Sequence, residues 1–413
     1  MTTSQPPGPA VPLYGTDFAA DPQRTYAMLR ARGPVALVEL APGVTATLVT
    51  DYATALKILH SPQDFAKDSR TWQESAPPDA AVLPMMSWRP NTLFADGGDH
   101  ARLRPPVTDS LRRTDPAALR RFVHDTASGL IDAVADRGHA DLIADYAAPL
   151  PLQVLHLMFG CTPGLSARMA AAMRALWDGS DPVRANEELE DCVRDLIAAK
   201  RADPGDDVTT RLLQHPHGLT DDELLHQLVV MMGAGVEPVA GWIGNALWLL
   251  LTETCFAENL VNGGVAIADA LDDVLWRHPP LANYAITYPV RPVRLGGTTL
   301  AAHEPVVISI AAANTDPAVV GPDGHVPTGN RAHLAFGAGP HGCPAHDPAR
   351  LIATVAIEAL LDALPGLRAA PDVHLHWRPG PFHRALSALP VVFPARTQRT
   401  TGGTPCPHHA TST

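Results

Sequence analysis

Apolar residues recur at helical spacing along most of this chain, and that periodicity predicts a mainly helical protein. The first predicted helix ends at Arg32, Gly33 and Pro34, since glycine followed by proline rarely continues a helix. The segments with the helical pattern are 21–31, 52–59, about 100–199, 267–276 and about 348–364. We therefore expect helices to make up most of the fold.

Strand patterns occupy much less of the chain. Residues 35–50 alternate between apolar and polar positions and contain turn residues, which predicts a β-hairpin. Short strands are expected at 284–287, 293–295 and 306–310, and long loops at 70–98 and 317–332. The predicted fold class is thus mainly α with small β-sheets. We expect a single domain over 1–396 and a disordered tail over 397–413, in which His408 and His409 are solvated rather than metal-bound.

The longest helix is predicted to begin at Thr220. Thr220 and Glu223 form a capping box, in which each satisfies a free amide of the first turn. From there the helical pattern continues to about Thr254, which gives a helix about 50 Å long. Its segment 228–251 is long and apolar enough to suggest a membrane span, but it contains one acid, one proline and four glycines. We therefore predict a buried central helix and no membrane association.

Charge and cysteine content narrow the possible functions. The chain has 31 basic and 43 acidic residues, a net charge of −12, and no basic stretch, so nucleic acid is not an expected partner. Residues 1–13 lack the charged-then-apolar order of a signal peptide. The five cysteines are Cys161, Cys192, Cys255, Cys343 and Cys406. They form no CxxC pair, which argues against a disulfide framework and predicts a reducing, cytoplasmic location.

The segment from Phe336 to Cys343 reads F-G-A-G-P-H-G-C and directly precedes a predicted helix. A cysteine at a helix N-terminus faces unpaired amides and the positive end of the dipole, so we expect a lowered thiol pKa. The glycines allow a tight loop whose backbone can approach a flat cofactor. A soft thiolate in apolar surroundings suits haem iron, whereas the simpler alternative is a buried structural cysteine.

This segment resembles the cytochrome P450 signature F-G-x-G-x-H-x-C. The similarity covers nearly the whole chain, through segments 26–30, 33–35, 96–104, 312–317 and 333–336. The resemblance implies the P450 fold, with the long central helix over a haem b (iron protoporphyrin IX). It also implies that Cys343 is the metal ligand and that Phe336 and Gly337 lie beside the haem.

Two further positions match the cationic residues with which this family holds its haem propionates. His100 and Arg104 lie one helical turn apart, so both can face the same anionic group. The resemblance places a propionate clasp at these two residues and at His341. A solvated helix face is the alternative for a His/Arg pair without such a cofactor.

The chain departs from the family where a buried charge network is usual. The family's Glu-x-x-Arg becomes Asp273-Val274-Leu275-Trp276, and its later arginine partner falls at Gly324. Losing both cations together avoids a stranded buried charge, so we interpret this as an alternative scaffold, resembling a small actinobacterial subgroup with Trp in place of Arg. In this interpretation Asp273 bonds to the Trp276 indole or to a backbone amide. A usual propionate arginine is also missing, near Thr287.

The family's distal helix carries Ala-Gly-x-acid-Thr over the iron, and here the run is Ala234-Gly235-Val236-Glu237-Pro238. The resemblance implies that Ala234 and Gly235 shape the oxygen pocket and that Glu237 relays protons. Proline removes the threonine hydroxyl and one N–H, and we expect it to keep the bend of the helix. The alternative is that Glu237 is a buried acid with a structural partner.

The residues after Cys343 also differ from the family. Pro344 removes one amide that could donate to the sulfur, and Ala345 stands where the family has glycine. Fewer donors leave a thiolate more electron-rich, which predicts a lower reduction potential.

The leading hypothesis is a haem-thiolate monooxygenase that inserts one oxygen atom from O2 into a small hydrophobic substrate. Electrons would come from a ferredoxin, for which the cluster Arg112, Arg113, Arg120 and Arg121 is a candidate docking surface, although a solvated helix face explains it equally well. Apolar residues at 85–88 and near Ile286 suggest a hydrophobic or aromatic ligand. The alternatives are peroxide use or phenolic coupling, and a haem or ligand sensor associated with a regulatory small-GTPase system.

Overall fold

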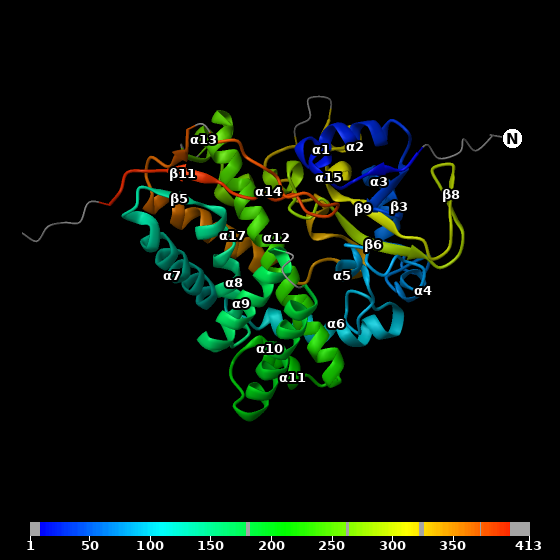
Figure 1. Ribbon diagram of the computed structural model, residues 1–413, viewed down its shortest axis with the longest axis horizontal. Coiled ribbons are helices and arrows are strands. Elements are labelled where there is room, and N and C mark those ends of the chain that lie inside the picture. Colours follow the sequence, from blue (N-terminus) through cyan, green and yellow to red (C-terminus); the bar gives the residue numbers. More distant parts are fainter. Residues whose placement is uncertain (1–8, 179–181, 262–263, 322–325, 372, 397–413) are drawn as a thin grey trace, which may run out of the picture.

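The computed structural model describes residues 9–178, 182–261, 264–321, 326–371 and 373–396. Helices gather on one side of the molecule and the largest sheet on the other (Figure 1). The longer helices are α6 (Gly97–Arg112), α7 (Pro116–Ala135), α8 (Pro149–Met158), α9 (Pro163–Asp178), α10 (Pro182–Ala202), α12 (Asp221–Thr252), α14 (Ile267–Arg277) and α17 (His346–Ala363). The shorter ones are α1 (Thr16–Ala20), α2 (Pro22–Arg30), α3 (Tyr52–Leu59), α4 (Arg70–Gln73), α5 (Leu83–Met86), α11 (Val208–Leu213), α13 (Thr254–Val261), α15 (Ile310–Asn314) and α16 (Pro317–Val320).

The largest sheet has six strands in the order β1-β2-β3-β9-β6-β4. Its strands are β1 (Val11–Pro12), β2 (Val35–Ala41), β3 (Val44–Val49), β4 (Phe65–Ala66), β6 (Asn283–Pro289) and β9 (Val306–Ser309). The predicted hairpin is the antiparallel pair β2–β3. A three-stranded sheet joins β5 (His139–Asp141), β10 (Arg368–Ala369) and β11 (Pro390–Val392), and a two-stranded one joins β7 (Val293–Leu295) and β8 (Thr298–Leu300).

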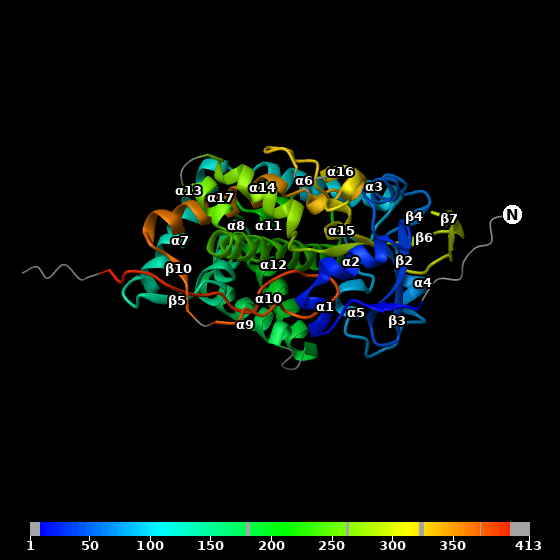
Figure 2. The same cartoon turned by 90° about the horizontal axis from the view of Figure 1, so that it is seen from above.

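Helix α12 runs through the middle of the molecule, with α14 and α17 on one side and α10 on the other (Figure 2). It begins with the predicted capping box, because the Thr220 hydroxyl accepts from Glu223 N–H and the Glu223 carboxylate accepts from Thr220 N–H. In the described part of the chain, α12 alone is long and apolar enough to cross a membrane. Trp242, Ile243 and Leu247 on it are at most 2% exposed and belong to the largest core cluster. The helix is therefore a core element.

The prediction of a mainly helical fold with small sheets and a long central helix is confirmed. The prediction of a continuous loop over 70–98 is wrong, because α4 and α5 lie inside it. Helices of one turn contain too few residues to show a periodic pattern. Helix α17 begins at His346, two residues before the predicted start, and Pro348 lies in its first turn, where no N–H is required. The predicted tail, with His408 and His409, lies outside the described residues.

Candidate functional site

The loop around Cys343 is tightly folded between the 3₁₀ turn η2 (Leu334–Phe336) and α17. The Cys343 N–H donates to the Phe336 carbonyl at 2.8 Å. Gly337 and Gly339 have φ angles of 69° and 68°, in the left-handed region that favours glycine. A Cβ on Gly339 would lie 2.2 Å from the Leu59 carbonyl oxygen of α3, so only glycine fits there. The glycines thus let this loop pack directly on α3.

The Cys343 sulfur receives fewer donors than a helix N-terminus normally offers. The Ala345 N–H donates to Sγ at 3.4 Å, while Pro344 has no N–H to give. Burial raises the pKa of the Cys343 thiol, and the Ala345 N–H and the Arg104 charge oppose this only in part. The expectation of a lowered pKa is therefore wrong for the protein alone, because desolvation outweighs one amide and a nearby cation. A metal ion bound to the sulfur would reverse this balance.

Three cationic or hydrogen-bonding side chains converge beside the cysteine loop. Arg104 of α6 donates to the Gly342 carbonyl, and the His100 and His341 rings lie 4.2 Å apart, centre to centre. The pKa of His100 falls to about 4, mainly because of burial and then because of His341 and Arg104. The three residues predicted as a propionate clasp thus come together at Cys343, from two segments of the chain.

One side-chain nitrogen of this cluster lacks a hydrogen-bond partner in the described part of the chain. The buried Nε2 of His100 finds no hydrogen-bond partner among the described residues. An anionic oxygen placed there would accept from this nitrogen and offset the charge of Arg104. A soft sulfur donor together with an unpartnered imidazole and a guanidinium fits a haem with anionic propionates.

Lys67 is a buried cation near this cluster that sequence reasoning missed. Its Nζ donates to the Ile286 carbonyl at 2.9 Å, and burial lowers its pKa to about 8. The neighbouring Thr287 has a buried hydroxyl that no described residue contacts by a hydrogen bond. A single lysine in a loop carries no local sequence signal, so only the tertiary structure could reveal it.

The distal run of α12 is helical throughout, including Pro238. Ala234 is exposed although Val236 and Met232 beside it are buried, so Ala234 faces open space next to the core. A Cβ on Gly235 would lie 2.7 Å from Leu155 Cδ1 of α8. The small size of Gly235 therefore permits close packing of α12 on α8.

Glu237 forms an ion pair with Arg378, which lies in the segment 377–386 that folds back on itself through a Trp377–Leu386 bridge. The Glu237 side chain is 14% exposed and the Arg378 side chain 35%. The chain separation is 141 residues, and no sequence pattern links the two. The acid matched to the family's proton relay is thus held by a cation that sequence reasoning did not anticipate.

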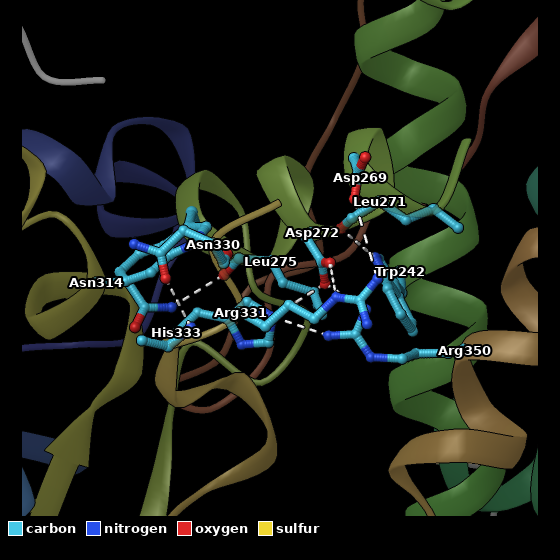
Figure 3. Close-up of polar contacts among 12 residues, drawn as sticks. Trp242, Asp269, Leu271, Asp272, Leu275, Asn314, Asn330, Arg331, His333 and Arg350 are labelled. Atoms are coloured by element: carbon cyan, nitrogen blue, oxygen red, sulfur yellow. Dashed lines mark hydrogen bonds and ion pairs between the residues drawn. The ribbon is translucent and has the colours of Figure 1, made fainter. Parts of the chain in front are cut away.

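The interpretation that Asp273 bonds to the Trp276 indole is wrong, and the structure shows Asp273 paired with Arg277 rather than with a backbone amide. Asp273 pairs with Arg277 at 2.7 Å on the helix surface, and its side chain is 44% exposed. The Trp276 indole donates instead to the Asn330 carbonyl at 2.8 Å. The buried acid is Asp272, which is 1% exposed and lies about 100° around the helix from Asp273. Figure 3 shows Asp272 beside Arg331 and Arg350.

Residues expected near a ligand share one small cavity. Met85, Met86, Tyr284 and Ile286 line a space of about 20 Å³ that Lys67 also borders. The predicted basic cluster at Arg112, Arg113, Arg120 and Arg121 is exposed. Arg120 pairs there with Glu358 of α17 at 3.1 Å.

No family model matches the chain. The chain is 33% identical over 405 residues to cytochrome P450 monooxygenase PikC of Streptomyces venezuelae, which covers 94% of this chain and 95% of that protein. It is 32% identical over 406 residues to cytochrome P450 107B1 of Saccharopolyspora erythraea, with 95% and 99% covered. The structure of CYP154A1 from Streptomyces coelicolor A3(2) is similar with a TM-score of 0.82 and 29% identity, over 93% of this chain and 100% of that one. CYP154C4 from Streptomyces sp. ATCC 11861 gives a TM-score of 0.86 and 26% identity, over 94% and 99%.

Proposed function

The chain belongs to the cytochrome P450 monooxygenase family, and we propose that it inserts one oxygen atom from O2 into a small hydrophobic substrate with electrons from a ferredoxin. The observation that carries this proposal is the buried His100 Nε2 beside Arg104 at the Cys343 loop, which has no hydrogen-bond partner in the described part of the chain. An anionic cofactor with a thiolate-binding metal would bond to the Cys343 sulfur through the metal and to His100 Nε2 through its anionic group. A cytoplasmic location is part of the proposal, since the five cysteines form no CxxC pair in the sequence.

The family uses a haem-thiolate cofactor, and we assign haem b to this chain. When bound, haem supplies the binding and activation of O2. Cys343 ligates the iron, His100, Arg104 and His341 hold the propionates, and Phe336 and Gly337 lie alongside. Lys67 joins this set as the cation that compensates for the arginine missing near Thr287, because its buried charge lies near Asp96 and His341.

Proton handling is assigned to α12 and Arg378. Pro238 offers neither a hydroxyl nor an N–H, so the Ala234 carbonyl lacks its usual helical donor and can accept from water. Arg378 fixes the Glu237 carboxylate in the distal part of the fold, where that carboxylate can orient the same water. The small side chain of Ala234 leaves space for this water. The lack of a side chain on Gly235 lets α8 pack closely against α12.

Electron delivery is assigned to an acidic ferredoxin. The exposed arginines of α6 and α7 offer a positive surface on a chain whose net charge is −12. Complementary charge speeds encounter more than it adds affinity, so we expect electron delivery to weaken as salt increases. Substrate binding is assigned to the apolar residues around Met85 and Ile286.

Two observations favour a second candidate function. The hydroxyl of the family's distal helix is absent, and the remaining acid is ion-paired with Arg378. These two features favour a haem-thiolate protein with non-standard chemistry, such as peroxide use or phenolic coupling.

Coupled turnover separates the two functions. Apolar compounds that shift the haem Soret band would be incubated with protein, ferredoxin, ferredoxin reductase and NADPH, and product would be measured against NADPH consumed. We expect hydroxylated product to account for a substantial part of the NADPH. Electrons passing entirely to peroxide, whatever the ligand, would contradict the monooxygenase assignment.

A further inference from the structure

The buried carboxylate of Asp272 joins three segments of the chain. Its side chain on α14 is 2% exposed. Oδ1 forms an ion pair with Arg350 Nη1 of α17 at 2.5 Å and lies 3.3 Å from His333 Nε2, while Oδ2 accepts from Arg331 Nε at 3.1 Å (Figure 3). Helix α14, the segment 331–336 and α17 thus meet at one acid.

The carboxylate is held in its ionised form. Burial raises the pKa of Asp272, but the bonds from His333 and Arg350 and their charges act more strongly together, so the pKa is lowered overall. Because the donors are themselves partly or fully buried, removing the negative charge would leave cationic groups without a partner. The His333 side chain is only 1% exposed, so water cannot easily replace the lost contact.

The same donors contact the residue that holds the cysteine backbone. The Arg350 guanidinium lies 5.4 Å from the centre of the Phe336 ring, and the His333 ring lies 5.8 Å from it. Phe336 in turn provides the carbonyl that accepts the Cys343 N–H at 2.8 Å. A continuous series of contacts therefore runs from Asp272 to Cys343.

A second connection between α14 and this segment runs through Asn314. Its Nδ2 donates to the Leu275 carbonyl at 2.9 Å, and its Oδ1 accepts from the Leu334 N–H at 2.8 Å (Figure 3). Trp276 adds a third through the Asn330 carbonyl, and its ring lies 5.9 Å from that of His333. Residues 330–334 are thus linked to α14 by several contacts, with Asp272 supplying the charged one.

We propose that Asp272 is the positioning residue that holds Cys343 in place for ligation of the haem iron. It acts through Arg350 and His333 on Phe336, and it stands one residue before the position at which the family's Glu-x-x-Arg begins. This inference rests on the proposed haem-thiolate function, but it concerns how the ligand is held and not whether it binds.

The test compares Asp272→Asn with Asp273→Asn in the haem-loaded protein. The control makes the same change of charge on the next residue of the same helix, whose side chain is 44% exposed, against 2% for Asp272. Circular dichroism would report folding, and the reduced, CO-bound spectrum would report the ratio of thiolate-ligated to other haem. We expect this ratio to fall at least about tenfold in Asp272→Asn and to remain unchanged in the control.

A folded Asp272→Asn protein with the wild-type ratio would overturn the inference, as would an equal loss in Asp273→Asn. If Asp272→Asn does not fold, Arg350→Gln serves instead, because Asp272 then keeps Arg331 and His333. Arg350→Gln should lower the ratio, and an unchanged ratio would overturn the inference. Intact protein without any thiolate-ligated haem would instead contradict the proposed function, and the inference with it.

Discussion

At the scale of single residues, the proposed chemistry depends on how buried charges are paired. Glu237 is held by Arg378, whereas His100 has a buried nitrogen without a described partner. The first arrangement is complete within the chain, whereas the second leaves a nitrogen to which an anionic oxygen from outside the chain can bond. On this basis we propose that Glu237 handles protons and that His100 binds the cofactor.

Glu237→Gln tests the assignment of proton handling. The amide keeps the shape of the side chain but cannot hold or release a proton, so product formed per NADPH should fall by about 100-fold. The matched control is Glu253→Gln, which removes an acid at the C-terminal end of the same helix. Equal product yields from Glu237→Gln and wild type would contradict the assignment.

At the scale of elements, the distal site depends on how closely α12 approaches α8. The two helices pack where Gly235 meets Leu155 Cδ1, and any side chain at 235 would have to push that leucine aside. Gly233 lies about half a turn earlier on α12, where nothing lies within 4 Å of an added Cβ. Gly235 thus permits the close contact between α12 and α8, whereas Gly233 has no such role.

Gly235→Ala should destabilise the protein by about 1–3 kcal/mol, because overpacking forces Leu155 and its neighbours to move. Gly233→Ala adds the same methyl group without that contact and should stabilise the helix by about 0.5–1 kcal/mol. Urea unfolding followed by circular dichroism would measure both changes. A Gly235→Ala protein as stable as Gly233→Ala would show that α8 does not pack this closely.

At the scale of the whole molecule, several histidines are buried in the neutral form. Burial is the largest cause in each case, and it lowers the pKa of His100, His156 and His383 to about 4 and that of His278 to about 3. In the unfolded chain a histidine titrates near 6.5, so below that pH the unfolded state binds more protons than the folded state. Stability should therefore be complete above about pH 6.5 and should fall as the pH drops toward 4.

His156→Gln tests this pH dependence, since His156 is only 4% exposed and glutamine does not titrate. Between pH 6.5 and 4 the variant should lose less unfolding free energy than the wild type, by up to about 3 kcal/mol. Urea midpoints measured across this range would give the slope. His124→Gln, at a largely exposed side chain, should leave the slope unchanged, and a wild-type slope in His156→Gln would refute the explanation.

Sequence alone predicted what depends on local pattern. The capping box at Thr220, the helical periodicity and the cysteine segment are each formed by residues close together in the sequence. Their consequences could therefore be derived before the fold was known. Arg378 and Lys67 could not be predicted, because their partners lie far away in the sequence. The interpretation of Asp273 failed for a different reason: one position along a helix changes the face on which a residue lies, and local pattern did not fix which face was buried.

The central claim is that Cys343 binds a haem iron as thiolate, and the reduced, CO-bound absorption spectrum tests it most directly. Intact protein loaded with haem should give the spectrum of a thiolate-ligated haem, and Cys343→Ser should lose that signature while remaining folded by circular dichroism. The same spectrum from both proteins, or no haem uptake by the intact protein, would contradict the claim.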